Sequence, residues 1–314
     1  MPSLSLKVWQ IDRLTPRITR LLLVSADTRP LPAFTPGAHL ELHVPGDKTC
    51  KRAYSLVNLP GADYYEIAVQ REDDGSGGSR WVHSLALGDC VDAEAPRNHF
   101  PLSDKADHYL LIAAGIGITA ILGMARALAA RDQPFSLHYA GRDASHMAYL
   151  EESLAFANAR SWISGGQLEK RLAVANILAV PAPGVHLYIC GPAAMITSVL
   201  NSARELGWKD DQLHYELFAG ALEQSGDQGF EVQLRDSGVT LQVGPGQSVL
   251  DTMIDAGLDP MFDCRRGDCG VCVARVIEGT ADHRDICLSE RDRASGSFCT
   301  CVSRASSSLL VLDL

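Results

Sequence analysis

The spacing of four cysteines near the C-terminus constrains this chain more than any other feature of its sequence. The cysteines are Cys264, Cys269 and Cys272, in a C-x4-C-x2-C run, and Cys301. Three thiolates on one short loop have to wrap a compact ligand. Gly267 and Gly270 lie within the run, and a residue without a Cβ lets the backbone turn tightly and point N–H groups at sulfur. The run therefore predicts an inorganic centre held by thiolates.

Several thiolate centres compete for such a pattern. Zinc sites favour two C-x2-C pairs or a later His-x3-5-His pair, whereas this tail has no second pair and its first spacing is four. A Rieske centre needs two histidine ligands on one iron, and no Cys-x-His pair occurs here. The C-x4-C-x2-C…C spacing is that of plant-type 2Fe–2S ferredoxins, so we expect a 2Fe–2S cluster.

The fourth ligand is ambiguous in the sequence because Cys299 and Cys301 flank Thr300. We predict Cys301, since Cys-Val-Ser is a familiar ferredoxin context. Cys299 is expected to pack as a small hydrophobic residue. We expect Cys50, Cys90 and Cys287 to pack as small hydrophobic residues as well.

Composition excludes several classes of function. With 314 residues, of which 46% are hydrophobic and 21% charged, the chain suits two or three ordinary globular domains. A formal net charge of -10 argues against nucleic acid. No apolar run approaches the roughly eighteen residues of a membrane span. Residues 1–20 show no leader pattern, so we expect a cytoplasmic protein with reduced thiols.

Residues 1–102 form the first predicted domain. Short alternating segments separated by Pro and Gly indicate an antiparallel β-barrel. The segments are residues 4–9, 18–25, 39–44 and 64–70.

Residues 103–225 change to a strand–helix alternation, which predicts a parallel sheet in an α/β domain. Expected strands are 108–114, 135–139 and 185–190, and expected helices are 118–131, 147–158 and 193–206. Residues 219–229 are interpreted as a linker. Residues 226–314 form the third domain, with a hairpin over 230–243, a helix over 249–256 and then the cysteine loop. The fold class is thus a multidomain α+β protein.

The barrel contains the segment Arg52-Ala53-Tyr54-Ser55-Leu56. An arginine fork can grip a phosphate, a tyrosine ring can stack on an isoalloxazine, and a serine hydroxyl can bond the flavin edge. Downstream, Gly77-Gly78-Ser79 opens the segment 79–87, where backbone amides at a helix start can bind an anion. The pattern therefore favours a flavin; taken alone, it also fits a polar strand edge.

Two further motifs follow buried strands in the α/β domain. Gly115-Ile116-Gly117 opens a helix, although Ala120 stands where the third glycine of a dinucleotide fingerprint would be. Cys190-Gly191-Pro192 follows another strand. Since both motifs lie at carboxyl ends of parallel strands, they can line one nucleotide crevice. The alternative for Cys190 is a buried structural thiol.

Together these motifs resemble the phthalate dioxygenase reductase family of the ferredoxin-NADP reductase superfamily, in particular its vanillate O-demethylase reductase subunits. The resemblance covers essentially the whole chain. It is carried by residues 52–58, 77–79, 96–100, 115–119, 190–192, 214–218 and the cysteine run. Two positions depart from the family: Ala114 and Ala120 replace a Gly and a Pro, which would weaken the nucleotide turn slightly.

The resemblance implies three domains: an FMN-binding β-barrel, an NAD-binding domain and a C-terminal β-grasp ferredoxin domain. Arg52, Gly78 and Ser79 would hold the FMN phosphate, and Tyr54 and Ser55 would contact the isoalloxazine. The full flavin set is Arg52, Ala53, Tyr54, Ser55, Gly77, Gly78 and Ser79. The nicotinamide set is Gly115, Gly117, Thr119, Cys190, Gly191 and Pro192. Phe218 would lie near the flavin with Glu216 beside it.

The expected activity is conversion of a hydride from NADH into single electrons, which pass through FMN to the cluster and then to a separate terminal oxygenase. We expect a Rieske-type oxygenase acting on an aromatic acid or aryl ether. Ser55, Cys190 and Glu216 are the candidate catalytic residues. No catalytic histidine is assigned, because the ten histidines show no paired arrangement in the sequence.

Two alternatives stay open at this point. One is a non-catalytic flavin and iron–sulfur redox sensor with a vestigial nucleotide crevice. The other is a reductase for a non-Rieske hydroxylase. The choice of NADH over NADPH follows the resemblance alone, because Arg142 could meet a 2′-phosphate and Asp143 would repel it.

Overall fold

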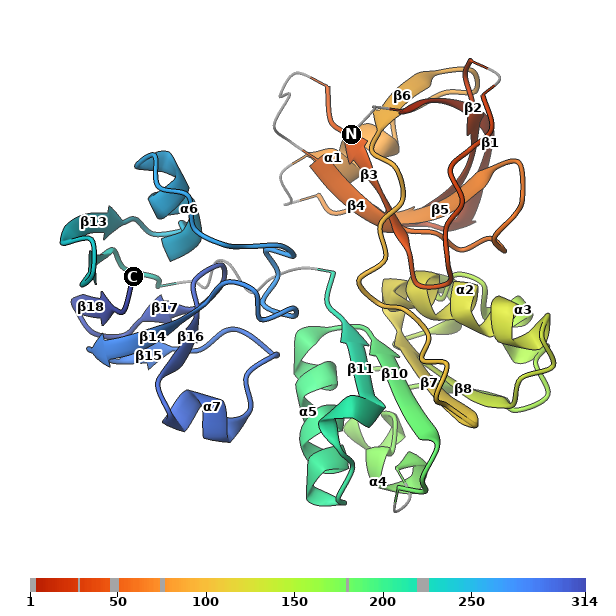
Figure 1. The fold of residues 1–314 in the computed structure, drawn as a ribbon. Helices are drawn as coiled ribbons and strands as arrows, with labels where there is room; N and C mark the ends of the chain where they lie inside the picture. Colours follow the sequence, from red (N-terminus) through yellow and green to blue (C-terminus); the bar gives the residue numbers. More distant parts are fainter. Residues whose placement is uncertain (1–3, 28, 46–50, 74–76, 179–180, 219–225) are drawn as a thin grey trace. The chain divides into compact units, whose positions relative to one another are not determined.

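The structure, a computed structural model, describes residues 4–27, 29–45, 51–73, 77–178, 181–218 and 226–314. The chain divides into two compact units, Met1–Glu216 and Leu217–Leu314 (Figure 1). The first unit contains an antiparallel lobe and a parallel lobe. Part of the expected linker, residues 219–225, lies outside the described residues.

The antiparallel lobe is a six-stranded sheet in the order β4-β3-β6-β1-β2-β5. Its elements are β1 (Leu4–Thr15), β2 (Ile18–Ser25), β3 (His39–His43), β4 (Lys51–Ser55), β5 (Tyr65–Gln70), α1 (Gly78–Val82) and β6 (Cys90–Ala93). Alternation places Leu21, Leu23, Leu40 and Leu42 on the inner face, where all are fully buried.

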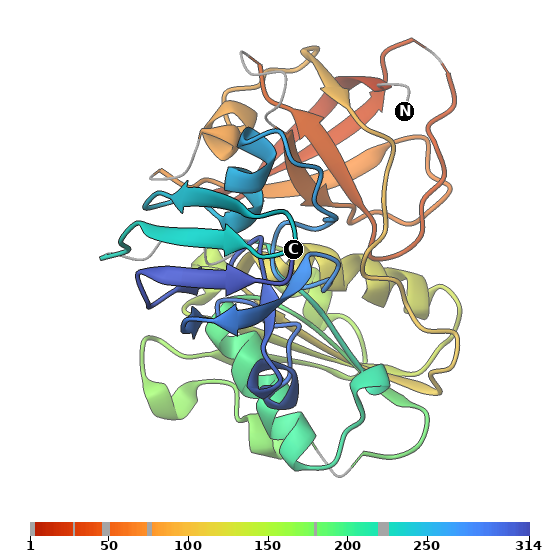
Figure 2. The same ribbon diagram turned by 60° about the vertical axis from the view of Figure 1, so that its left-hand side comes forward.

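The two edges of this sheet meet, so that the sheet curls on itself (Figure 2). Just after β4, the Val57 N–H donates to the carbonyl oxygen of Glu66 on β5 over 2.9 Å. The Glu66 N–H in turn donates to Oδ1 of Asn58 over 2.8 Å. These bonds satisfy edge groups that an open sheet would leave unpaired, as the barrel prediction requires.

The parallel lobe is a five-stranded sheet in the order β11-β10-β7-β8-β9, with β7 at its centre. This is the order of a doubly wound nucleotide-binding fold. Its strands are β7 (His108–Ala114), β8 (Phe135–Gly141), β9 (Ala159–Ile163), β10 (Val185–Cys190) and β11 (Leu213–Glu216). Its α-helices are α2 (Ile118–Ala129), α3 (Leu150–Leu154), α4 (Val174–Ile177) and α5 (Ala193–Glu205). Short 3-10 helices cover Gly115–Gly117, Ala144–His146, Leu168–Lys170 and Asp210–Gln212.

One predicted helix of this lobe is wrong. Residues 147–158 were expected to be helical throughout, but only Leu150–Leu154 is helical, and β9 begins at Ala159. Met147 has an extended backbone, and Tyr149 takes a left-handed conformation with φ of 57°. A helix cannot pass through either conformation.

The second unit contains a five-stranded mixed sheet in the order β13-β12-β18-β14-β16 and a two-stranded ribbon, β15-β17. Its strands are β12 (Phe230–Leu234), β13 (Val239–Val243), β14 (Val273–Glu278), β15 (Ala281–Asp282), β16 (Ser297–Cys299), β17 (Arg304–Ala305) and β18 (Leu309–Leu312). Its α-helices are α6 (Val249–Asp255) and α7 (Glu290–Ala294). The predicted hairpin over 230–243 is confirmed as β12 and β13, and the helix over 249–256 as α6. Among the described residues, no helix is long and apolar enough to cross a membrane.

Candidate functional site

The four predicted cluster ligands form one connected group of thiols in the second unit. The Cys301 thiol interacts with those of Cys264 and Cys272, and the Cys269 thiol interacts with that of Cys264. The loop before β14 supplies three of them, and the turn after β16 supplies the fourth. Such a set of soft sulfur donors is what an iron–sulfur cluster requires.

Cys299, the alternative fourth ligand, lies at the periphery of this group of thiols. The Cys299 thiol interacts with that of Cys272, and its sulfur lies 3.2 Å from the sulfur of Cys287. It is fully buried and packs with apolar neighbours such as Leu250 and Leu288. Cys301 therefore neighbours two cysteines of the run and Cys299 only one, which supports Cys301 as the predicted fourth ligand.

Backbone conformation explains why the run contains glycines. Gly267 has φ of 77°, and a Cβ there would lie 2.5 Å from Cγ2 of Val302 and 3.1 Å from Cα of Asp285. Only glycine fits both the conformation and the space. The Arg266 N–H donates to the sulfur of Cys264 over 3.3 Å. The loop thus fits a thiolate-bound cluster, because its backbone turns around sulfur and offers it an N–H group.

A buried carboxylate holds the segments around this loop together. Asp285 accepts hydrogen bonds from the Leu288 N–H at 3.1 Å and from the Ser303 hydroxyl at 3.0 Å. The carbonyl oxygen of Gly267 accepts N–H groups from Ile286 and Cys287 at 3.0 and 3.2 Å. These bonds fix the cysteine loop to the turn that carries Cys301 and so pre-organise the sulfur donors.

Hydrogen bonds among the thiols favour the charged form of two of them. The bond from Cys301 lowers the pKa of Cys264 to about 3. Bonds from Cys299 and Cys301 lower the pKa of Cys272 to about 2. The same interactions raise the pKa of Cys301, and burial raises the pKa of Cys269 to about 11. The thiolate is the metal-binding form of cysteine, so binding of a metal would release protons from these two thiols. Sequence reasoning missed Asp268, whose pKa is raised to about 7 chiefly by burial; an acidic residue inside the run was the available signal.

In the first unit, the flavin motif and the glycine motif lie against each other. A Cβ on Gly78 would come within 2.7 Å of Cγ of Arg52. The close approach of α1 to the Arg52 side chain therefore requires glycine at position 78. Gly77 precedes the helix with φ of 97°. The segments that contain Arg52 and Gly78, which are separated in sequence, thus form one polar site, called here the Arg52–Gly78 corner. This site fits a phosphate bound by the arginine side chain.

The other predicted flavin residues differ in exposure. Tyr54 is partly buried against the inner face of the barrel, Ser55 is buried and Ala53 is exposed. The hydroxyl of Ser79 already accepts a hydrogen bond from the Glu72 N–H at 3.0 Å. Its contact with a flavin phosphate therefore stays a prediction.

The two predicted nucleotide motifs come together at the carboxyl edge of the parallel sheet. A Cβ on Gly117 would lie 2.3 Å from the carbonyl oxygen of Cys190 and 2.8 Å from the backbone nitrogen of Gly191. A Cβ on Gly191 would lie 2.9 Å from Cβ of Ala114. Glycine at both positions lets the two strand ends approach closely, as a pyrophosphate turn requires.

The departures at Ala114 and Ala120 do not disturb this turn. Ala114 is extended, with φ of -137°, which suits alanine. Ala120 is fully buried in α2, where alanine is the best helix former. Thr119 is buried and donates to the carbonyl oxygen of Ile116 over 3.0 Å, which closes the first turn of the helix. Gly115 is half-buried at the start of the 3-10 helix, with nothing within 4 Å of a Cβ built there, and Pro192 is exposed directly before α5.

The remaining candidate residues lie at or beyond the end of this sheet. Cys190 and Glu216 are register partners on β10 and β11, and both are buried. The thiol of Cys190 packs in the apolar core, so it also satisfies the structural alternative. Phe218 belongs to the second unit and is 37% exposed; its place beside a flavin stays a prediction.

Two histidines that are 28 positions apart in the sequence lie next to each other in the structure. His186 Nδ1 and His214 Nε2 lie 2.9 Å apart on β10 and β11, and the His214 ring stacks on Tyr188 with centroids 4.4 Å apart. Burial lowers the pKa of both histidines, that of His214 to about 4. The pair is therefore neutral at pH 7. It was invisible in the sequence because adjacency of β10 and β11 is decided by the sheet.

Among the described cysteines outside the cluster group, Cys90 departs from expectation. Cys90 is exposed at the start of β6 instead of packing as a buried hydrophobic residue. The alternation of β6 explains this exposure, because Cys90 and Asp92 are exposed on one face while Val91 and Ala93 are buried on the other. Cys287 is half-buried beside the cluster group, and Cys50 lies outside the described residues.

Comparisons with known proteins agree with this geometry. Residues 91–213 match the family model of the dimethylamine monooxygenase subunit DmmA-like N-terminal domain, and residues 232–306 match that of the 2Fe-2S iron-sulfur cluster binding domain. A vanillate O-demethylase oxidoreductase of Pseudomonas sp. (strain HR199 / DSM 7063) is 43% identical over 304 residues, 95% of each chain. A heme-dependent oxidative N-demethylase beta subunit of Ectopseudomonas mendocina (strain ymp) is 37% identical over 315 residues, 99% of each chain.

Among solved structures, phthalate dioxygenase reductase superposes with a TM-score of 0.75 and 33% identity, covering 99% of this chain and 98% of that one. Its description is a modular structure for electron transfer from pyridine nucleotides to [2Fe-2S]. The fold and the site define this protein as an oxidoreductase that uses a flavin, a pyridine nucleotide and a 2Fe–2S cluster. The chain belongs to the phthalate dioxygenase reductase family, together with the vanillate O-demethylase oxidoreductases.

Proposed function

We propose that this chain is the reductase component of a two-protein oxygenase or O-demethylase system. It takes electrons from NADH by way of FMN and hands them from its cluster to a separate terminal oxygenase. The observation that carries the proposal is the presence of three compatible sites in one chain: the Arg52–Gly78 corner, the Gly117–Gly191 edge and the four-thiol group. We propose a cytoplasmic location, which the use of a reduced nicotinamide donor and of thiols that must stay reduced supports.

A bound flavin accepts two electrons with a hydride and releases them singly, and a 2Fe–2S cluster carries one at a time. The chain supplies position and charge around these groups. Arg52 holds the flavin phosphate, and the Ser55 hydroxyl orients the flavin edge. The backbone at Gly117 and Gly191 receives the nucleotide, with Cys190 and Glu216 shaping the nicotinamide environment. The four thiolates hold the iron, and no protein group transfers a proton.

The acceptor is proposed to be a Rieske-type oxygenase acting on an aromatic acid or aryl ether. This follows the resemblance to vanillate O-demethylase oxidoreductases. A second candidate is a heme-dependent demethylase, because a relative of the same length and of 37% identity is the beta subunit of such an enzyme. The oxygenase, and not this chain, would select the organic substrate.

The test is an anaerobic titration of the purified holoprotein with NADH, followed by absorption. We expect both the flavin and the cluster bands to bleach, and acid extraction to release FMN and not FAD. The matched variant Cys272→Ser should lose the cluster and the reduction of any acceptor, yet keep NADH-driven bleaching of the flavin. A flavin band that NADH leaves unchanged would refute the proposal in favour of a redox sensor.

A further inference from the structure

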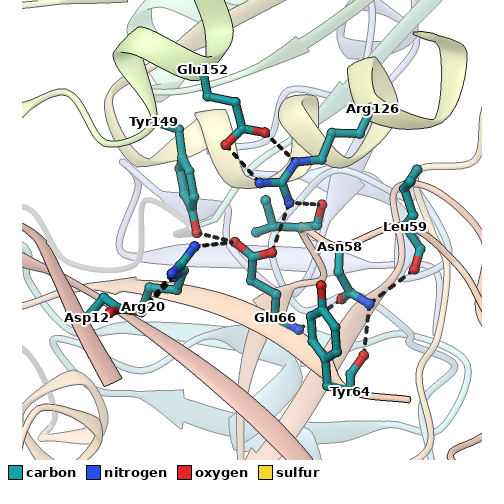
Figure 3. Close-up of polar contacts among 10 residues, drawn as sticks. Asp12, Arg20, Asn58, Leu59, Tyr64, Glu66, Arg126, Tyr149 and Glu152 are labelled. Atoms are coloured by element: carbon teal, nitrogen blue, oxygen red, sulfur yellow. Dashed lines mark hydrogen bonds and ion pairs between the residues drawn. The ribbon is translucent and has the colours of Figure 1, made fainter. Parts of the chain in front are cut away.

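A buried carboxylate on the barrel is surrounded by groups from both lobes of the first unit. Glu66, on β5, is only 4% exposed. It accepts hydrogen bonds from Arg126 Nη1 and from the Tyr149 hydroxyl, each at 2.9 Å, and Arg20 Nη1 lies 3.8 Å away (Figure 3). A buried charge is costly unless it is paired, so Glu66 holds these partners at fixed places.

The most connected of these partners is Arg126 on α2. Its guanidinium donates to both oxygens of Glu152, at 2.7 and 2.9 Å, and to Oε2 of Glu66. Nη1 also donates to the carbonyl oxygen of Val57 over 2.8 Å. A planar fork with several fixed donors restrains direction as well as distance. Arg126 thereby fixes α2 to the chain just after β4.

Both ends of this restraint lie on elements that carry the predicted cofactor sites. Val57 is two residues beyond Ser55, the last residue of the flavin strand β4. Arg126 belongs to the helix that begins directly after the nucleotide turn Gly115–Gly117. The helix also meets this strand end at Gly123, where a Cβ would lie 2.7 Å from the carbonyl oxygen of Leu56.

We propose that Arg126 is a positioning residue for hydride transfer. By bonding Val57 and Glu66 it sets the separation between the flavin strand and the nucleotide turn. This inference rests on the proposed function. A misplacement of about 1 Å can slow a reaction about 100-fold even when it arises far from the chemistry, so the restraint acts on the rate of hydride transfer and not on binding.

Apolar contacts that do not involve Arg126 also hold the two lobes together. Ile18, Val57 and Ala68 of the barrel share one apolar core with Ile121 and Met124 of α2. Apolar contacts hold surfaces together but are not directional. Loss of the guanidinium should therefore loosen the alignment while leaving the fold, the flavin and the cluster in place.

The experiment compares the holoprotein with Arg126→Met and with the control Arg131→Met, an exposed arginine just beyond the same helix. Anaerobic stopped-flow mixing with NADH measures the limiting rate of flavin bleaching and the dissociation constant of NADH. For Arg126→Met we expect a rate lower by about 10- to 100-fold, with the dissociation constant, flavin content and iron content within twofold of the original. Long-wavelength absorbance from the nicotinamide–flavin contact should fall as well. Arg131→Met should match the original protein.

Arg126→Lys carries the same expectation if the methionine variant does not fold, because lysine keeps the charge and loses the fork. A limiting rate within twofold of the original would overturn the inference. So would a slower rate that merely follows loss of flavin or of thermal stability. If NADH does not bleach the flavin of the unmodified protein, the proposed function fails. If NADH bleaches the flavin of the unmodified protein and of the Arg126 variants at the same rate, only this inference fails.

Discussion

Replacing Cys301 by serine is expected to remove the cluster, whereas the same change at Cys299 should leave it in place. Cys301 neighbours both Cys264 and Cys272, while Cys299 neighbours Cys272 and the non-ligand Cys287. Both variants make the same chemical change two residues apart. The comparison therefore isolates the role of each sulfur.

The size of the two effects follows from the surroundings. Cys299 is fully buried among apolar side chains. A serine hydroxyl without a hydrogen-bond partner there should lower the free energy of unfolding by about 1–3 kcal/mol. As a neighbour of a ligand, Cys299 should change metal affinity by about 10- to 100-fold at most, and excess iron and sulfide should still fill the site. Loss of Cys301 removes a ligand outright, and filling should fail.

The assay is anaerobic reconstitution with iron and sulfide, followed by analysis of bound iron and by visible absorption. The double variant Cys299→Ser/Cys301→Ser completes the set. A cluster that survives in Cys301→Ser and vanishes in the double variant would show that Cys299 is the fourth ligand and refute the geometric reasoning. NADH-driven bleaching of the flavin should be normal in all three variants.

Two further predictions concern the first unit. Gly117→Ala should raise the KM for NADH about tenfold or more with flavin and iron content unchanged, because its Cβ would lie 2.3 Å from the backbone oxygen of Cys190. Gly141→Ala is the control, since the three atoms nearest to its Cβ all belong to the flexible side chain of Met147. Equal KM values in the two variants would contradict this prediction. Burial lowers the pKa of His214 to about 4, so the folded state binds fewer protons than the unfolded state, and stability should fall as pH drops from about 6.5 toward 4. His214→Phe should flatten this slope in thermal melts, and the remaining slope is expected from His138 and His186, whose pKa values burial also lowers. An unchanged slope would argue against a neutral buried His214.

Local patterns in the sequence predicted those parts of the molecule that are built locally. The cysteine run, the hairpin over 230–243 and the central strands over 108–114 and 185–190 all appear where they were expected. Each is encoded by residues within a few positions of one another. The nucleotide edge was also predictable, because carboxyl ends of parallel strands meet in any doubly wound sheet.

The remainder depends on which distant segments become neighbours. β9 was not predicted because its five residues, Ala159–Ile163, are short and follow a segment that resembles a helix. The pairing of His186 with His214 follows from the order of β10 and β11, and the bond from Arg126 to Glu66 joins residues 60 positions apart. No local sequence pattern indicates either pair, so both could be found only from the tertiary structure.

The central position of β7 has a consequence for synthesis of the chain. One edge of this strand pairs with β8, which follows soon after it, but the other pairs with β10, which begins only at Val185. At about 5–20 residues per second the ribosome takes several seconds to deliver that partner. During this interval a strand rich in Leu, Ile and Ala presents an unsatisfied edge. Nascent chains arrested before Val185 should therefore be the aggregation-prone species, and the ones that chaperones engage.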